Sequence, residues 1–271
     1  YDEECKKNPN YIDWGKYHKF QDIVETNLYS PSLSIFPLEN YHNDETAYFY
    51  LYKYCGISDC IRRGYKWEEH QHAIINKYLT PDSIAVEVGS HIGTITVKLS
   101  KVVKEVYAFE PFKSSYDLLE KNLKLNNCHN VKIFNKGVSN TCSSTHIKWV
   151  SDNNPGGLGL EGGEITKKGN QNQKIKVELL TLDSLYLKGL DFLKIDVEGF
   201  ETQVINGSQK TIKEYMPLIV IEIFEDMVTG IKASDKTIME RFGFLFEIGY
   251  VYEHIYFEDF LFIPPNLTKN K

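Results

Sequence analysis

Short apolar runs alternate with amphipathic stretches along most of the 271-residue chain. Each apolar run is brief and is bounded by turn residues, which is typical of buried strands. The amphipathic stretches repeat their apolar residues at helical spacing. The strands predicted in this way are residues 84–88, 106–110, 131–134, 192–196 and 217–224, with a closing pair at 244–248 and 259–263. The predicted helices are residues 67–80, 94–99, 114–126 and 234–242. This alternation predicts an α/β fold.

Residues 140–180 interrupt the alternation. Segments 145–150 and 174–180 are predicted as strands, and a glycine-rich loop lies between them at 154–163. We interpret this region as a β insertion, whose loop is either a lid over the acceptor or a plain connection.

The first 66 residues differ in composition from the rest of the chain, because they hold ten of the 18 tyrosines. Residues 48–54 are predicted as an aromatic strand, and Pro31 and Pro37 are predicted to bracket an apolar turn. We expect this segment to be a cap on the sheet edge or over the ligand site, with some tyrosines touching substrate. The expected divisions of the chain are an aromatic-rich cap at 1–66, a catalytic domain at 67–264 and a polar tail at 265–271.

Two glycines separate the strand at 84–88 from the helix at 94–99. Gly89 and Gly93 allow positive φ angles and a close approach of the backbone to a ligand. The helix that follows offers unpaired N–H groups and the positive end of its dipole. This turn is therefore a place to hold a small molecule with a negative or polar part.

Two features indicate which molecule binds here: the incomplete glycine fingerprint of the turn and the acidic residue at the end of the next strand. A dinucleotide fingerprint reads G-x-G-x-x-G, whereas Ser90, His91 and Ile92 fill the space between the two glycines here. Glu110 ends the next strand about 20 residues after the turn, where a carboxylate can accept hydrogen bonds from both ribose hydroxyls. A nucleoside cofactor without phosphate fits this pattern, and S-adenosylmethionine is the expected one.

Three motifs carry a family resemblance: Val86-Glu-Val-Gly-Ser-His-Ile-Gly-Thr-Ile-Thr96, Ala108-Phe-Glu-Pro111 and Phe192-Leu-Lys-Ile-Asp-Val-Glu-Gly-Phe-Glu201. Together they resemble the FkbM family of class I S-adenosylmethionine-dependent methyltransferases, over residues 65–263. The Lys-Ile-Asp-Val-Glu-Gly stretch is the specific part, since many methyltransferases share the first motif. The resemblance implies a Rossmann-like, mostly parallel seven-stranded sheet whose last strand is antiparallel. It also implies O-methylation, often of sugars or natural products.

The resemblance also implies roles for single residues. Glu68, which in its own right suits the start of a helix dipole, would face the amino group of the cofactor. Residues 135–138 would touch adenine, although a plain turn explains them almost as well. His91 stands where the family has a small or amide residue, and its side chain would reach toward the substrate. The expected cofactor-binding residues are Glu68, Glu87, Gly89, Ser90, His91, Gly93, Thr94, Glu110, Pro111, Phe112, Lys136, Gly137, Val138 and Asp196.

Charged residues inside a buried strand give the candidate catalytic group. Lys194 and Asp196 lie on the same face of their strand, because side chains alternate along it. A buried ion pair is costly, and its place at the mouth of a ligand site favours function over a purely structural pairing. Methyl transfer to a hydroxyl needs in-line alignment and a proton acceptor. We expect Asp196 to be this base and Lys194 to orient it. His91 and Glu222 are the next candidates.

Other chemistries are weighed against this one. Asp196, Glu198 and Glu222 would make an oxygen-ligand site for Mg²⁺, but nothing in their spacing demands a metal and none is predicted. The glycine pattern disfavours an NAD-dependent oxidoreductase, and motifs of serine hydrolases, zinc proteases and P-loop enzymes are missing from the sequence. A non-catalytic cofactor-binding or scaffold module is the other class that stays open.

The net charge, the lengths of the apolar runs and the cysteine content limit the partners and the location expected for the chain. A net charge of -6 and a pI of about 5.8 argue against a broad nucleic-acid surface. No apolar run is long enough to span a membrane. Five scattered cysteines favour free thiols and a cytoplasmic location. The start lacks an initiator Met, so we expect the chain to belong to a longer one. The combined prediction is an O-methyltransferase that uses S-adenosylmethionine to methylate a hydroxyl of a sugar or glycan acceptor.

Overall fold

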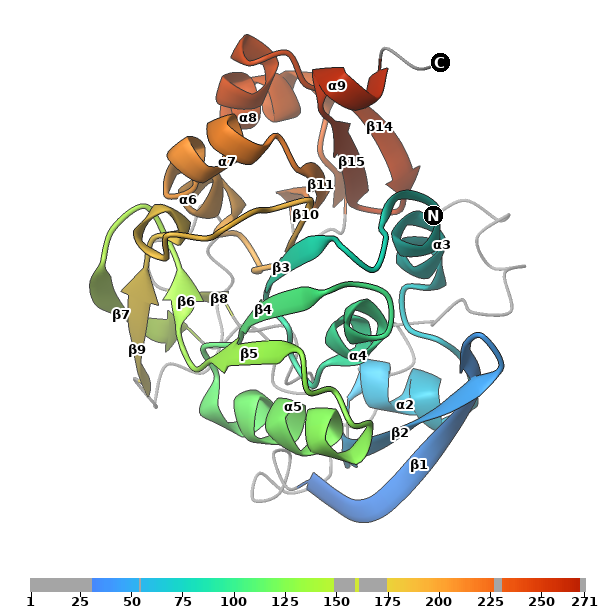
Figure 1. Cartoon of the computed structure of the whole chain (residues 1–271). Helices are drawn as coiled ribbons and strands as arrows, with labels where there is room; N and C mark the ends of the chain where they lie inside the picture. Colours follow the sequence, from blue (N-terminus) through green and yellow to red (C-terminus); the bar gives the residue numbers. More distant parts are fainter. Residues whose placement is uncertain (1–30, 54, 149–158, 161–174, 227–230, 269–271) are drawn as a thin grey trace.

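The computed structural model describes residues 31–53, 55–148, 159–160, 175–226 and 231–268. A seven-stranded sheet runs through the centre of the molecule (Figure 1). The strand order across this sheet is β14-β15-β11-β10-β3-β4-β5. The bounds are β3 Ile84–Val88, β4 Glu105–Phe109, β5 Val131–Phe134, β10 Phe192–Ile195, β11 Leu218–Glu222, β14 Val251–Tyr256 and β15 Asp259–Ile263.

The direction of the strands confirms the predicted sheet. The five neighbours from β11 to β5 are all parallel, whereas β15 pairs antiparallel with both β11 and β14. The carboxyl ends of the parallel strands therefore meet at one edge of the sheet. The first residue of β15 lies at this same edge, because that strand runs in the opposite direction. Ligands of open α/β sheets bind at such an edge.

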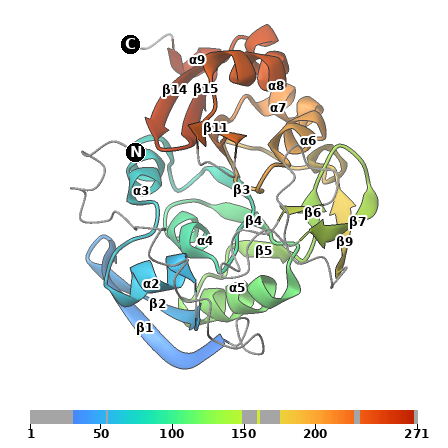
Figure 2. The ribbon, with the colours of Figure 1, turned by 180° about the vertical axis from the view of Figure 1, so that it is seen from behind.

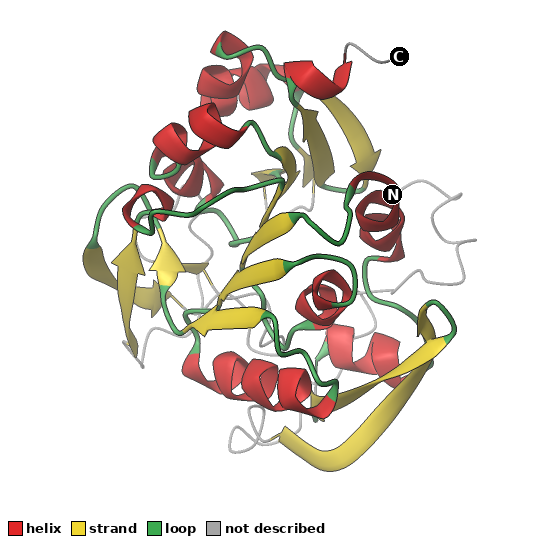
Figure 3. Cartoon of the chain, in the orientation of Figure 1, coloured by secondary structure: helices red, strands yellow, loops and turns green. Residues whose placement is uncertain are grey.

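Helices cover both faces of the sheet (Figures 2 and 3). On one face lie α3 (Glu69–Tyr78), α4 (Thr94–Ser100) and α5 (Lys113–Leu125), whose apolar side chains share buried clusters with β3, β4 and β5. On the other face lie α6 (Glu201–Asn206), α7 (Gln209–Tyr215) and α8 (Asp235–Glu247), which pack on β10 and β11. This layering is the α/β architecture that the alternation predicts.

One predicted strand is wrong. Residues 244–248 alternate like a strand, but the structure places 244–247 in the last turns of α8. Phe242 and Leu245 are both fully buried, and their separation of three residues is a helical spacing. The helix ends before Gly249, whose φ of 92° favours glycine. The strand that pairs with β15 is instead β14.

The apolar turn predicted between Pro31 and Pro37 is also wrong. Both prolines lie in one strand, β1 (Pro31–His42), which pairs antiparallel with β2 (Glu45–Tyr52). The turn of this hairpin falls at Asn43 and Asp44, which have φ angles of 45° and 64°, as hairpin turns of the primed types require. The short helix α2 (Gly56–Arg62) follows.

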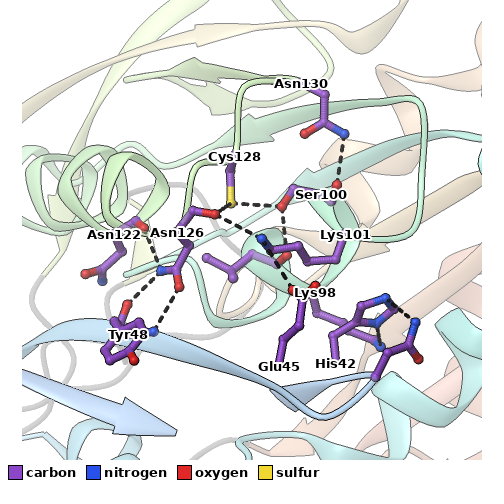
Figure 4. Close-up of polar contacts among 12 residues, drawn as sticks. His42, Glu45, Tyr48, Lys98, Ser100, Lys101, Asn122, Asn126, Cys128 and Asn130 are labelled. Atoms are coloured by element: carbon purple, nitrogen blue, oxygen red, sulfur yellow. Dashed lines mark hydrogen bonds and ion pairs between the residues drawn. The ribbon is translucent and has the colours of Figure 1, made fainter. Parts of the chain in front are cut away.

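The hairpin is fastened to α5 by two side-chain amides. Asn122 accepts from the backbone N–H of Tyr50 at 2.7 Å and donates to its carbonyl at 3.1 Å. Asn126 does the same with Tyr48, at 2.8 and 2.7 Å. Figure 4 shows the second of these clamps. Each amide takes the place of a neighbouring strand, so the free edge of β2 keeps its backbone hydrogen bonds.

Smaller elements complete the description. A four-stranded sheet has the order β6-β9-β7-β8, with bounds β6 Gly137–Val138, β7 Ser143–Lys148, β8 Gly159–Leu160 and β9 Ile175–Leu180. These strands agree with the predicted β insertion, but most of its glycine-rich loop lies outside the described residues. The remaining elements are β12 Phe224–Asp226, β13 Ile231–Lys232, the 3-10 helix Leu182–Ser184 and α9 Pro265–Thr268. Within the described residues, no helix has the length and apolarity needed to cross a membrane.

Candidate active site

The turn between β3 and α4 is a place where two parts of the backbone approach closely. Gly89 has a φ of 90°, and a Cβ atom there would lie 1.7 Å from the backbone oxygen of Asp196. Gly93 has a φ of 89°, and a Cβ atom would lie 2.6 Å from the Cδ1 atom of Leu119. Both positions require glycine, so the turn is tight for steric reasons as well as conformational ones. The contact at Gly89 also brings the ends of β3 and β10 together.

Glu110 holds this turn and leaves acceptor capacity for a ligand. Its carboxylate accepts the backbone N–H of His91 and that of Phe112, both at 2.8 Å. Each of its oxygens therefore still has a lone pair that a ribose hydroxyl can use. Burial raises the pKa of Glu110 to about 7, although the two N–H donors act in the opposite direction. The residue fits the ribose-binding role that the sequence predicts.

His91 contributes a neutral ring rather than a charge. Its φ is 47°, and its ring lies 5.7 Å from that of Tyr52. Neither ring nitrogen has a hydrogen-bond partner among the described residues. Burial lowers the pKa of His91 to about 4, against the attraction of Asp196. The ring is therefore uncharged at neutral pH, and one of its nitrogens can accept a hydrogen bond from a ligand hydroxyl.

Lys194 is the cation at the centre of the carboxyl edge. Its side chain is 3% exposed, and its Nζ atom lies 3.0 Å from Oδ2 of Asp196 and 3.6 Å from Oε2 of Glu68. Glu87 lies beside it on the adjacent strand, because the two residues pair across β10 and β3. Burial alone would lower the pKa of Lys194, but the surrounding carboxylates outweigh it and raise the pKa well above 10.5. The predicted pairing of Lys194 with Asp196 is present.

The carboxyl groups around Lys194 differ in their protonation. Burial would raise the pKa of Asp196, but Lys194 and a hydrogen bond from Glu222 lower it below 3.8. Burial and the Asp196 charge raise the pKa of Glu222 well above 4.5. Burial also raises the pKa of Glu68 to about 8 and that of Glu87 to about 7. Asp196 is therefore ionised at neutral pH, and Glu222 takes up a proton more readily than Asp196 does.

A histidine–carboxylate pair that the sequence analysis does not predict lies at the same edge. Nε2 of His70 contacts Oδ2 of Asp259, which also accepts from Nε2 of Gln71 at 3.0 Å. Asp259 is the register partner of Glu222, so it lies beside the carboxylate cluster. The two members of the pair are 189 positions apart, and local patterns do not reach that far. The direction of the last strand is the one signal that would have placed Asp259 here.

Some predicted site residues lie elsewhere. Lys136 Nζ is 2.9 Å from Oε2 of Glu178, so its side chain is engaged in the four-stranded sheet. Val138 is 2% exposed and belongs to the main core. Phe112 is buried in a cluster with residues of the four-stranded sheet. Glu198 precedes the next helix, because α6 begins at Glu201. The cofactor roles of Lys136, Gly137, Val138, Pro111 and Phe112 stay predictions.

The alternative metal ligands do come together. Asp196, Glu198 and Glu222 each offer a carboxylate oxygen, and these oxygens lie within 4.8 Å of one another. Glu198 reaches this position with a φ of 54°. The charge of this group is reduced, however, because Lys194 pairs with Asp196, and burial beside Asp196 raises the pKa of Glu222 and so favours its protonated form. To bind here, a divalent cation would have to displace Lys194 from Asp196 and compete with a proton for Glu222.

The mostly parallel sheet, the glycine turn after β3 and the carboxylate that follows β10 form the Rossmann-like arrangement of a class I methyltransferase. The Methyltransferase FkbM domain model matches residues 87–252. The chain therefore belongs to the FkbM methyltransferase family, as the sequence motifs predict. It is a methyltransferase, and S-adenosylmethionine is the methyl donor that its sequence motifs predict.

Individual proteins and solved structures are similar to this chain. Methyltransferase sdnD of Sordaria araneosa is 27% identical over 207 residues, which are 65% of this chain and 78% of that protein. The crystal structure of Methyltransferase FkbM from Methylobacillus flagellatus KT superposes with a TM-score of 0.47 and 14% identity, over 68% of this chain and 44% of that one. A Streptococcus mutans protein solved in complex with SAH gives a TM-score of 0.44 and 15% identity, over 72% of this chain and 94% of that one.

Proposed function

We propose that this methyltransferase methylates a hydroxyl group, most plainly one of a sugar in a glycan or glycoconjugate. The observation that carries the hydroxyl part is the ionised Asp196 carboxylate at the carboxyl edge of the sheet. A hydroxyl must lose its proton as it is methylated, and a carboxylate beside it can accept that proton. The sugar part is supported by the family resemblance of the motifs alone.

In this proposal, separate residues bind the cofactor, accept the proton and orient the base. S-adenosylmethionine supplies an electrophilic methyl carbon bonded to a sulfonium sulfur. Glu110 binds the ribose hydroxyls and, with the glycine turn, fixes the position of the cofactor. Asp196 hydrogen-bonds the acceptor hydroxyl and takes its proton as the oxygen attacks. Lys194 holds the carboxylate in place, and its charge keeps Asp196 ionised between turnovers.

Geometry supplies most of the rate in such a displacement, because the acceptor oxygen, the methyl carbon and sulfur must lie in line. Lys194 and Glu222 both bind Asp196, which restricts its carboxylate to one orientation. His70, oriented by Asp259, offers a second hydrogen-bonding group for the acceptor at the same edge. An acceptor with several hydroxyls, such as a sugar, suits two such polar groups.

The test is a screen of methyl glycosides and simple alcohols with isotope-labelled S-adenosylmethionine, run on the wild type and on Asp196→Asn. We expect a labelled methyl ether from at least one sugar and a loss of turnover of about 10²–10⁴-fold in the variant. Asp117→Asn makes the same chemical change on the surface of α5, where Asp117 pairs with Lys113, and should keep full activity. Full activity of Asp196→Asn would end its role as the base.

A metal-assisted transfer is the second candidate, because the three carboxylates at Asp196, Glu198 and Glu222 come together. It predicts that a chelator abolishes turnover and that Mg²⁺ restores it. The proton-acceptor mechanism predicts unchanged turnover with the chelator. Measuring one progress curve with and without EDTA separates the two.

A further inference from the structure

A second buried lysine lies outside the site described above. Lys98, on α4, is 1% exposed. Its Nζ atom lies 2.7 Å from Nδ1 of His42, the last residue of β1. Figure 4 shows Lys98 and His42 together, with the pair formed by Lys101 and Glu45 next to them. The ammonium group is therefore held between a helix and the tip of the hairpin.

Lys98 differs from Lys194 in that no acid neutralises it. Within the described part of the chain, its ammonium group makes no ion pair with a carboxylate, and its one polar contact is His42. Glu45, the nearest acid of the hairpin, pairs instead with Lys101 at 3.8 Å. An ammonium group has three N–H donors, so Lys98 retains unused donors in a buried place. Leaving a buried charge without a partner is costly.

A buried histidine lies beside the same part of the hairpin. His72, on α3, is 5% exposed, and neither of its ring nitrogens has a hydrogen-bond partner among the described residues. Its ring lies 5.0 Å from that of Tyr41, the residue before His42. The hydroxyl of Tyr41 donates to the carbonyl of Thr94, one turn before Lys98 on α4. Tyr41 therefore ties His72 and Lys98 to one side of the hairpin.

The electrostatic setting is positive. Burial and the nearby charge of Lys66 lower the pKa of Lys98 to about 8. Burial, together with the charges of Lys98 and Lys66, lowers the pKa of His72 to about 3. Lys66 pairs with Glu69, at 3.7 Å on the surface of α3. Water would satisfy the unused donors of Lys98 but would leave its charge uncompensated.

We propose that Lys98, His42 and His72 form a binding site for a small oxyanion of the phosphate or sulfate type. Lys98 supplies the charge and its unused donors. His72 supplies a ring nitrogen that has no partner among the described residues. His42, whose ring nitrogens contact Lys98 and Asn43, is partly exposed and borders the site at the tip of the hairpin. The site does not include Lys194, whose charge already has Asp196 and Glu68 as partners.

The proposal is tested by thermal unfolding and calorimetric titration with inorganic phosphate, sulfate and glucose 6-phosphate, at constant ionic strength set with chloride. We expect each anion to bind and to raise the Tm of the wild type, because a ligand that binds only the folded state stabilises it. Tighter binding of glucose 6-phosphate than of phosphate would identify a phosphate ester as the source of the anion. Equal binding would identify the free anion.

For Lys98→Met we expect a higher Tm without phosphate and a lower affinity for phosphate, and these two effects together test the proposal. Without phosphate its Tm should rise, because the change removes an unpaired buried charge and keeps an apolar chain of similar size. With phosphate it should bind about tenfold more weakly or not at all, since charge-assisted hydrogen bonds are lost. His72→Phe keeps the ring beside Tyr41 and should also weaken binding.

Lys101→Met is the matched control, because it removes a lysine three positions along the same segment that already has an acid partner. It should leave the response to phosphate intact. S-adenosylhomocysteine should bind all three variants as it binds the wild type, since none of these residues touches the glycine turn. No effect of phosphate or sulfate on the wild type, or equal binding by Lys98→Met, would overturn the proposal.

Discussion

Two lysines of this protein are buried to the same extent in regions of opposite character. Lys194 lies among carboxylates at the carboxyl edge of the sheet and is 2% exposed, and Lys98 lies under the hairpin and is 1% exposed. The pKa of Lys194 is raised well above 10.5 because acids surround it. The pKa of Lys98 is lowered to about 8 because burial is not compensated there. Burial alone does not decide the state of a charge, and the partners present decide it.

The largest effect is expected from removing the lysine that has partners. Lys194→Met leaves Asp196 and its neighbouring carboxyl groups buried without a cation, which should reduce the free energy of unfolding by about 3–5 kcal/mol. Chemical denaturation measures this change. Lys98→Met is the matched substitution at the lysine without an acid partner and should be neutral or stabilising. If the two variants lose equal stability, the contrast between the regions is wrong.

Glu110→Ala tests whether the acid-rich region binds the cofactor. The variant loses the acceptor for the ribose hydroxyls and the two N–H contacts that hold the turn, so S-adenosylhomocysteine should bind about 10–100-fold more weakly. Calorimetric titration measures the affinity. Glu105→Ala, at the opposite end of β4, removes an acid that pairs with Lys132 and should bind normally. Unchanged affinity in Glu110→Ala would remove the ribose assignment.

Lys98 and Lys194 are also expected to change the pH dependence of stability in opposite directions. Lys98 in the folded protein loses its proton at about pH 8, whereas the unfolded chain keeps it up to about pH 10.5. Between these values the unfolded state binds more protons, so this residue makes stability rise with pH, by roughly 1–3 kcal/mol. Lys98→Met should remove that rise, and Lys101→Met should keep it. Lys194 acts in the opposite direction, because its raised pKa means that its contribution is lost only at higher pH.

A smaller effect is expected on cofactor affinity below neutral pH. Glu110 has a pKa of about 7, and ribose hydroxyls donate to its ionised form. Binding below this pH must release a proton, so affinity for S-adenosylhomocysteine should fall about tenfold for each pH unit below 7. Titrations of the wild type and Glu110→Gln at several pH values check this. A slope that persists in Glu110→Gln would assign the proton to another group.

The sequence predicted the sheet and the glycine turn well, because both rest on local features. The run at 84–88, the two glycines and the acid at Glu110 are neighbours along the chain or one strand apart. The strand that pairs with β15 was misplaced because residues 244–248 alternate like a strand over a length too short to separate the two periods. Only the structure shows that residues 244–247 belong to α8, beyond a kink at Phe242, whose φ of -119° and ψ of 25° are not helical.

Other features of the structure depend on contacts between residues that are far apart in the sequence, and local patterns do not predict such contacts. Lys98 looks like a polar position on an amphipathic helix, and nothing local shows that the hairpin of residues 31–52 covers it. The clamps of Asn122 and Asn126 on that hairpin join residues more than seventy positions apart. The pairing of Lys194 with Asp196 was predictable because it depends only on the alternation within one strand.

The most direct measurement is calorimetric titration of the purified chain with S-adenosylhomocysteine, with NAD as the control. The site built from the glycine turn, Glu110 and Asp196 predicts one-to-one binding of S-adenosylhomocysteine and no binding of NAD. A folded chain that binds NAD, or that fails to bind S-adenosylhomocysteine, would contradict the assignment of this edge of the sheet as the cofactor site of a methyltransferase.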